Sequence, residues 1–269
     1  MTSPLSQQLV DSLFADLTFV PRARYLTSTS STNDALKRMA AEGAPEGTLV
    51  VADEQTAGRG RLERKWVAPP GTSILLSILF RPGTEMQVSP LQYTIVCSLA
   101  VRDAVRERLA LELGLKWPND LVYQDRKLGG ILTEIETGYS GVAYVIVGIG
   151  INANWDPSGA EFDQPATSLC NLVGKPVSRA ELLRAIVGRI AERYAALRAD
   201  ESPVKEWEIA LDTIGKAVVV ESPGERLEGF AVGVDADGAL MVRSADGSLH
   251  RVMAGDVRVR RMPFVKSSG

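Results

Sequence analysis

The sequence of 269 residues contains a single histidine, His250, and only two cysteines, Cys97 and Cys170. One histidine argues against catalysis by a Ser-His or Cys-His pair and against a histidine-rich metal site. The cysteines lack the spacing of a metal site, so we expect them to be reduced, buried thiols of a cytoplasmic protein. We expect His250 to be a surface residue of a strand.

Long apolar segments are also lacking, because no run approaches the roughly 18 residues needed to span a bilayer. The N-terminal residues carry Asp11 and Asp16 and no basic start, which is unlike a signal peptide. The net charge of -3 and the pI near 5.4 argue against a dedicated DNA-binding protein. The hydrophobic fraction of 45% is enough for a sizeable core. We therefore expect a globular protein without a membrane or nucleic-acid partner.

The pattern of the first 212 residues predicts an α+β domain. Consecutive strand-like runs over residues 115–150 favour antiparallel pairing within a mixed sheet, and we expect the helices on one side of it. A long helix is expected from Pro90 to just before Gly114. Another is expected over residues 179–197, capped by Ser178.

The residue pattern changes from Ile214 onward, where short runs of alternating apolar and polar residues, typical of strands, are separated by glycine-containing turns. This pattern predicts a small β-barrel or sandwich. We therefore divide the chain into a domain of residues 1–212 and a smaller one of residues 213–269.

The stretch "EQTAGRGRLERKW", residues 54–66, lies between two predicted strands and concentrates positive charge around Gly58 and Gly60. Glycine amides in a tight turn can form an anion cradle, and arginine adds a bidentate fork for phosphate or carboxylate. A solvated hairpin would have the same composition. Spacing alone leaves both interpretations open.

Three further segments carry polar residues and glycines at strand ends. "LKWPNDLVY" (115–123) places Lys116 at the end of a strand. "DRKLGGILTE" (125–134) contains a glycine pair, and "VGIGINAN" (147–154) joins two glycines to two asparagines. Paired glycines in strands indicate a bulge or a close approach by a ligand. Each segment alone is equally compatible with a surface lysine, an ordinary turn or simple packing.

Taken together, "SSTN" (30–33), "EQTAGRGRLERKW", "KWPNDL" (116–121), "RKLGGILTE" (126–134) and "GIGINAN" (148–154) resemble the ordered motifs of biotin protein ligases. The chain resembles the monofunctional form without an N-terminal DNA-binding domain. The resemblance implies a class II synthetase-like mixed sheet with flanking helices, followed by a small SH3-like β-barrel. It also implies a monomer or a homodimer.

The reaction implied by the resemblance has two steps. Biotin and MgATP give biotinyl-5′-AMP and pyrophosphate, and a lysine of a biotin carboxyl carrier domain then attacks the adenylate. The substrates and cofactors would be biotin, ATP and Mg²⁺, with no metal ligand expected from the protein itself. No histidine base is needed in the first step, because its nucleophile is already a carboxylate.

The resemblance also implies site residues. The catalytic residues would be Lys116, Arg59 and Arg61. The biotin-binding residues would be Ser31, Thr32, Asn33, Gln55, Gly58, Arg59, Gly60, Arg61, Lys116, Lys127, Gly129 and Gly130. The ATP-binding residues would be Arg59, Arg61, Trp66, Lys116, Asn119, Asn152 and Arg260. Glu63 departs from the family, since many members have a third glycine there. Asp120 is a candidate to assist the acceptor lysine.

Three alternatives stay open at this point. A lipoate–protein ligase would use the same adenylate chemistry with a longer apolar pocket. A nucleic-acid-binding protein would use the arginine-rich loop to hold phosphates, although the acidic pI counts against it. A catalytically inert biotin binder would keep the pocket without the reaction.

Overall fold

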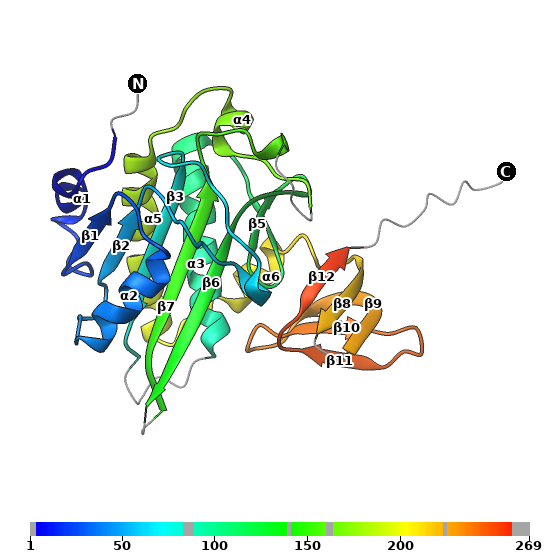
Figure 1. The fold of residues 1–269 in the computed structure, drawn as a ribbon. Coiled ribbons are helices and arrows are strands. Elements are labelled where there is room, and N and C mark those ends of the chain that lie inside the picture. The colour runs from blue at the N-terminus through cyan, green and yellow to red at the C-terminus, as the bar shows by residue number, and fades with distance from the viewer. Residues whose placement is uncertain (1–3, 83–88, 139–140, 160–163, 223–224, 260–269) are drawn as a thin grey trace.

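The computed structural model describes residues 4–82, 89–138, 141–159, 164–222 and 225–259. A large sheet with flanking helices is followed by a smaller all-β module, coloured orange to red in Figure 1. The helices are α1 (Gln7–Phe14), α2 (Thr32–Ala41), α3 (Pro90–Leu109), α4 (Leu169–Val173), α5 (Arg179–Arg198) and α6 (Val204–Ala210), with 3-10 turns η1 (Arg61–Glu63) and η2 (Pro157–Gly159). The strands are β1 (Ala23–Leu26), β2 (Leu49–Ala52), β3 (Ser73–Phe80), β4 (Gly114–Lys116), β5 (Asp120–Tyr123), β6 (Arg126–Gly138), β7 (Gly141–Asn152), β8 (Ala217–Ser222), β9 (Glu225–Val234), β10 (Leu240–Arg243), β11 (Leu249–Val252) and β12 (Asp256–Val259).

The large sheet has the strand order β1-β2-β3-β7-β6-β5-β4. Only β1 and β2 pair in parallel, and the other neighbours are antiparallel. The predicted mixed, mostly antiparallel sheet is therefore confirmed. The β5–β6 hairpin turns at Gln124 and Asp125, which both have positive φ angles. This conformation suits a two-residue hairpin because its twist matches that of the strands.

Helices cover both faces of this sheet, so the expectation that they lie on one side is wrong. Ile74, Leu76 and Ile78 of β3 belong to the core that contains α3 and α5. Leu79 faces the other way and packs with Leu36 of α2 in a second apolar cluster. Since successive strand residues point to opposite faces, the continuous apolar run of β3 serves both cores. The run of buried residues thus reflects two covered faces.

Helix α3 ends earlier than its sequence predicts. It stops at Leu109, and Ala110 adopts a left-handed conformation with φ 53° while its N–H donates to the carbonyl of Arg106. Gly114, expected to lie just past the helix, instead begins β4. A Cβ added at Gly114 would lie 2.2 Å from the Asp212 carboxylate. Glycine at this position therefore allows close packing rather than ending a helix.

The C-terminal module is a five-stranded antiparallel sheet with the order β11-β10-β9-β8-β12. Figure 1 shows it beside α6 and β5, and most of its buried apolar side chains belong to the same apolar cluster as those of the large domain. The Trp117 indole donates a 3.0 Å hydrogen bond to the carbonyl of Gly238, in the β9–β10 turn. The Trp117 backbone N–H donates at 3.0 Å to the Thr213 hydroxyl. These bonds fix the module against the strand end that carries Lys116.

No helix among the described residues combines the length and the apolarity that crossing a membrane requires.

Candidate active site

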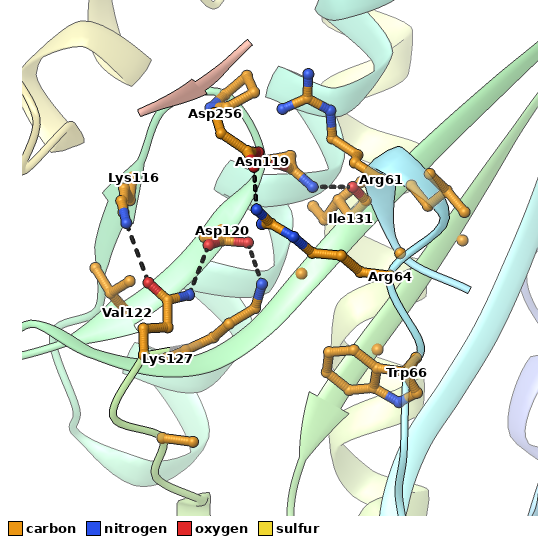
Figure 2. Close-up of a pocket in the computed structure, with 18 of the residues that line it drawn as sticks. Arg61, Arg64, Trp66, Lys116, Asn119, Asp120, Val122, Lys127, Ile131 and Asp256 are labelled. Atoms are coloured by element: carbon orange, nitrogen blue, oxygen red, sulfur yellow. Dashed lines mark hydrogen bonds and ion pairs between the residues drawn. The ribbon is translucent and has the colours of Figure 1, made fainter. Parts of the chain in front are cut away.

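A cavity of about 1020 Å³ lies between the large sheet, the glycine loop and β12. Thirteen of the predicted site residues line it: Ser31, Thr32, Asn33, Gln55, Arg59, Gly60, Arg61, Trp66, Lys116, Asn119, Lys127, Gly130 and Asn152. Figure 2 shows Lys116 and Lys127 together with Arg61 and Arg64 of the loop around this space. The remaining glycines support the wall, since Gly58 packs against the backbone of Trp66 and Gly129 against that of Gly150. Arg260 lies outside the described residues.

One part of the cavity is a buried polar network at the start of α2. The Thr32 backbone N–H donates to Gln55 Oε1 at 2.8 Å, and the Thr32 hydroxyl lies 3.0 Å from the same oxygen. Ser77 Oγ lies 2.7 Å from Thr32 Oγ1 and 2.6 Å from Asn33 Oδ1. Asn33 Nδ2 donates to Glu134 Oε2 at 2.7 Å, which fixes the orientation of the Asn33 amide. Ser77 therefore connects Thr32 and Asn33, which are two of the predicted site residues.

This network has more acceptors than donors. Three oxygen–oxygen contacts join Gln55, Thr32, Ser77 and Asn33, but the two hydroxyls supply only two protons. The Gln55 and Asn33 oxygens are fixed as acceptors by their other hydrogen bonds. A ligand that presents N–H donors would complete the bonding, because buried polar groups require partners.

A second part of the cavity contains two lysines around one carboxylate. Lys127 Nζ lies 2.6 Å from Asp120 Oδ1. Lys116 pairs with Asp120 across β4 and β5 but forms no side-chain ion pair with it, and its ammonium donates to Gln164 Oε1 at 3.1 Å. The Gln164 amide nitrogen donates in turn to Asp120 Oδ2 at 3.1 Å. The cluster holds two positive charges and one negative charge, so it favours an anionic ligand.

Burial lowers the pKa of Lys116, and the nearby Lys127 and Arg64 act in the same direction. The carboxylates of Asp120 and Asp256 oppose the shift. A partly desolvated ammonium is a strong partner for an anion, since less water screens the interaction. Lys116 is therefore suited to bind a carboxylate or a phosphate that enters the cavity.

The glycine loop is folded back on itself. The Gly60 N–H donates to the carbonyl of Arg64 at 2.7 Å, and the Trp66 N–H donates to that of Gly58 at 2.9 Å. Leu62 at its tip has a positive φ of 52° and is 56% exposed. The loop is thus a structured turn in contact with other elements, which excludes an entirely solvated hairpin.

The arginines of this loop have different partners. Arg59 forms a bidentate pair with Asp34 of α2, at 2.8 and 2.6 Å, and lies 3.5 Å from Glu134. Its hydrogen bonds hold the pKa of Asp34 below the usual value. Arg61 donates to the carbonyl of Gly255 at 3.1 Å. The loop therefore links α2 to the C-terminal module.

Trp66 packs its ring on the β7 backbone in the cavity wall. A Cβ added at Gly150 would lie 2.8 Å from two atoms of the indole ring, so only glycine allows this position. Trp66 Nε1 and Asn152 Oδ1 are buried, and neither has a hydrogen-bond partner among the described residues. One is a donor and the other an acceptor, as a planar heterocyclic base in this wall would require.

Several residues of the site were not predicted from the sequence. Ser77, Glu134 and Gln164 hold the predicted residues in place, and Asp256 approaches from the C-terminal module. Ser77 left a weak signal, since it is a polar residue in the middle of an apolar strand. No such signal marks Glu134, Gln164 or Asp256, which only the folding of the chain brings next to the site. The Glu63 side chain lies outside the described part of the structure, so its departure from the family stays without an account.

No group of three potential metal-ligating side chains is found among the described residues. The chain itself therefore offers no cage for a metal ion within this part of the structure.

Comparison with known proteins agrees with this geometry. Residues 25–152 match the biotin/lipoate A/B protein ligase family, and residues 213–260 match the biotin protein ligase C terminal domain. The biotin–[acetyl-CoA-carboxylase] ligase of Mycobacterium tuberculosis is 35% identical over an aligned length of 252, and the alignment covers 86% of each chain.

Two solved structures have the same fold. The biotin protein ligase of Aquifex aeolicus in complex with biotin and ATP is 30% identical, with a TM-score of 0.77 over 90% of this chain and 100% of that one. The Leishmania major biotin protein ligase in complex with biotinyl-5-AMP is 27% identical, with a TM-score of 0.62 over 87% and 99%. The chain therefore belongs to the biotin protein ligase family and is an ATP-dependent ligase.

Proposed function

We propose that this protein activates biotin with ATP and transfers it to a lysine of a biotin carboxyl carrier domain. In the first step, an oxygen of the biotin carboxylate attacks the α-phosphorus of ATP and pyrophosphate leaves. In the second, the acceptor amine attacks the carbonyl carbon of biotinyl-5′-AMP, an amide forms and AMP leaves. The acceptor lysine loses one proton in this second step.

The first step is mainly an electrostatic problem, because a carboxylate must approach a phosphate. Lys116 and Lys127 are the residues we assign to this task. A positive charge about 4 Å from a negative one contributes roughly 4 kcal/mol at an effective dielectric near 20. Loss of one such preorganised donor typically reduces the rate by about 10²–10³. We assign Lys116 as the principal catalytic residue, with Arg59 and Arg61 holding the loop over the adenylate.

The observation that carries biotin as the substrate is the excess of acceptors around Ser77. The ureido ring of biotin has two N–H donors, and one of them would supply the proton that the three oxygen–oxygen contacts lack. A lipoyl dithiolane has no N–H donor and would leave this buried network incomplete. The same cavity offers Lys116 to the carboxylate that both acids share. The polar network therefore favours biotin, while the lysines alone do not discriminate.

For ATP we propose the Trp66 wall as the base site, with Asn119 and Asn152 as further contacts of the nucleotide. Gly60 and Gly130 would leave room for the ligands, Gly58 and Gly129 would allow the close backbone packing behind them, and Ser31 would hold the start of α2. Mg²⁺ is expected to arrive with ATP and to be held mainly by its phosphates. We also propose the division into a catalytic unit of residues 1–212 and a β-module of residues 213–269.

For the second step we propose that Asp120 assists proton removal from the acceptor lysine. Its two oxygens already accept from Lys127 and Gln164. An incoming amine would therefore displace one of these donors. The loop would meanwhile keep water from the anhydride.

The test is incubation of the protein with biotin, MgATP and a biotin carboxyl carrier domain, followed by intact mass measurement. A mass increase of the carrier that needs both ligands is the expected result. ATP–pyrophosphate exchange measured with biotin and with lipoate tests the first step alone. Exchange with lipoate and none with biotin would overturn the assignment of the substrate. Biotin binding without exchange would indicate an inert binder.

A further inference from the structure

We propose that Gln164 is a positioning residue for biotin activation, because its side-chain amide accepts a hydrogen bond from the Lys116 ammonium and holds it without neutralising it. The inference rests on the proposed function and names a residue that its motifs do not contain. Gln164 Oε1 accepts from Lys116 and Gln164 Nε2 donates to Asp120, each at 3.1 Å. One amide therefore connects the cation to the carboxylate.

This arrangement leaves the positive charge of Lys116 available to a ligand. Asp120 Oδ1 is 2.6 Å from Lys127, so this carboxylate balances one of the two ammonium groups. Figure 2 shows Lys116, Asp120 and Lys127 on one side of the cavity. If Lys116 reached Asp120 directly, a single carboxylate would be shared by both lysines. A neutral amide between them leaves the Lys116 charge for a ligand.

The backbone next to Gln164 is held in place by β6. The Lys127 N–H donates to the carbonyl of Pro165 at 2.8 Å, and the Thr167 N–H donates to the carbonyl of Lys127 at 2.8 Å. Residues 165–167 therefore pair with the strand that carries the second lysine. The backbone of Lys127 thus holds the segment that follows Gln164. This pairing keeps the Gln164 side chain at a fixed distance from Lys116 and Asp120.

Other charged groups also face Lys116 and influence its pKa. Asp256 of β12 and Asp120 of β5 stabilise its charged form, whereas Lys127 of β6 and Arg64 of the glycine loop destabilise it. Burial is the larger influence and lowers the pKa. Position 164 contributes no charge of its own. A carboxylate introduced there would add a direct ion pair.

The experiment compares Gln164→Glu and Gln164→Met with the wild type in biotin-dependent ATP–pyrophosphate exchange across pH. Glutamate keeps the shape but compensates the Lys116 charge. We expect exchange at neutral pH to fall about ten- to hundredfold, mainly in kcat, since hydrogen bonds to charged groups are of this strength. Methionine should cause a similar loss. The exposed Gln8→Glu in α1 adds the same charge far from the site and should leave the rate unchanged.

The pH profile separates a positioning role from a structural one. Lys116 acts when protonated, so activity is lost as the pH rises through its pKa. A carboxylate at position 164 raises that pKa, and the alkaline limb should therefore move to higher pH in Gln164→Glu. A merely structural role would lower the rate without moving this limb. Thermal unfolding of each variant identifies a loss of fold, and Gln164→Met keeps the test open if the charged variant is unstable.

The outcomes distinguish this inference from the proposed function. If the wild type shows no biotin-dependent exchange, the proposed function fails whatever position 164 does. If the wild type exchanges and both Gln164 variants keep its rate and its alkaline limb, the positioning role is wrong. A reduced rate with a shifted limb in Gln164→Glu supports it.

Discussion

Arg61 of the glycine loop donates a 3.1 Å hydrogen bond to the backbone carbonyl of Gly255, which lies 194 residues later in the C-terminal module. Arg64 reinforces the link through an ion pair with Asp256, as Figure 2 shows. The loop and the module therefore meet over the cavity. Both arginines would have to shift if a phosphate chain needed the same nitrogens.

This contact predicts that Asp256→Asn loosens the loop. Trypsin cleavage between Arg59 and Lys65 should become several-fold faster, whereas the free energy of unfolding should change by less than about 1 kcal/mol, as is usual for exposed ion pairs. Limited proteolysis followed by mass spectrometry measures the first effect. Glu228→Gln, which alters an ion pair within the module, is the matched control. Biotin with ATP should slow cleavage of the wild type, and equal cleavage with and without ligands would contradict a closing loop.

Replacement of Lys116 by methionine should abolish biotin-dependent exchange and preserve the fold measured by circular dichroism. It should also change how stability depends on pH. The pKa of Lys116 is lowered in the folded state, so the unfolded chain binds more protons between that value and the ordinary pKa near 10.5. The wild type should therefore gain stability with rising pH across this window. Lys116→Met should lack this gain in urea unfolding at several pH values.

The sequence predicted the sheet and the small β-module from residue patterns, and most of the site residues implied by the family resemblance line the cavity. It could not predict which partners those residues have. Gln164 carries no local signal, and its role depends on the pairing of the following residues with Lys127. The left-handed conformation of Ala110 could not be predicted either, since alanine favours a helix and no glycine marks the end of α3. Such features depend on tertiary packing.

The sequence also could not predict which helices cover each face of the sheet. The apolar run of β3 predicts a buried strand, but it does not say that α2 covers one face and α3 the other. Only the order of the strands, with β3 between β2 and β7, makes this strand central. A prediction of helices on one side follows from element order alone and fails for this reason.

Two glycines of β7 are predicted to control the two ligands separately. Gly150→Ala would force the Trp66 ring from the wall and should weaken ATP binding about tenfold with little change for biotin. Gly148→Ala would place a Cβ 2.4 Å from Asn33 Oδ1 and should weaken biotin binding instead. Isothermal titration with each ligand measures both effects. Gly188→Ala on helix α5 is the control, and identical losses for both ligands in both variants would contradict separate sites.

Ser77→Ala should reveal whether the buried network holds the biotin pocket. The change removes the hydroxyl between Thr32 and Asn33 and leaves a buried acceptor without its donor, which typically costs about 1–3 kcal/mol of stability. Biotin affinity should fall about tenfold, because the Asn33 side-chain oxygen loses the hydroxyl that donates to it. Ser98→Ala is the matched control, since Ser98 is also buried but donates only to a carbonyl of its own helix. If both serine variants bound biotin with wild-type affinity, the substrate would not depend on this network, and the argument for a ureido ligand would lose its support.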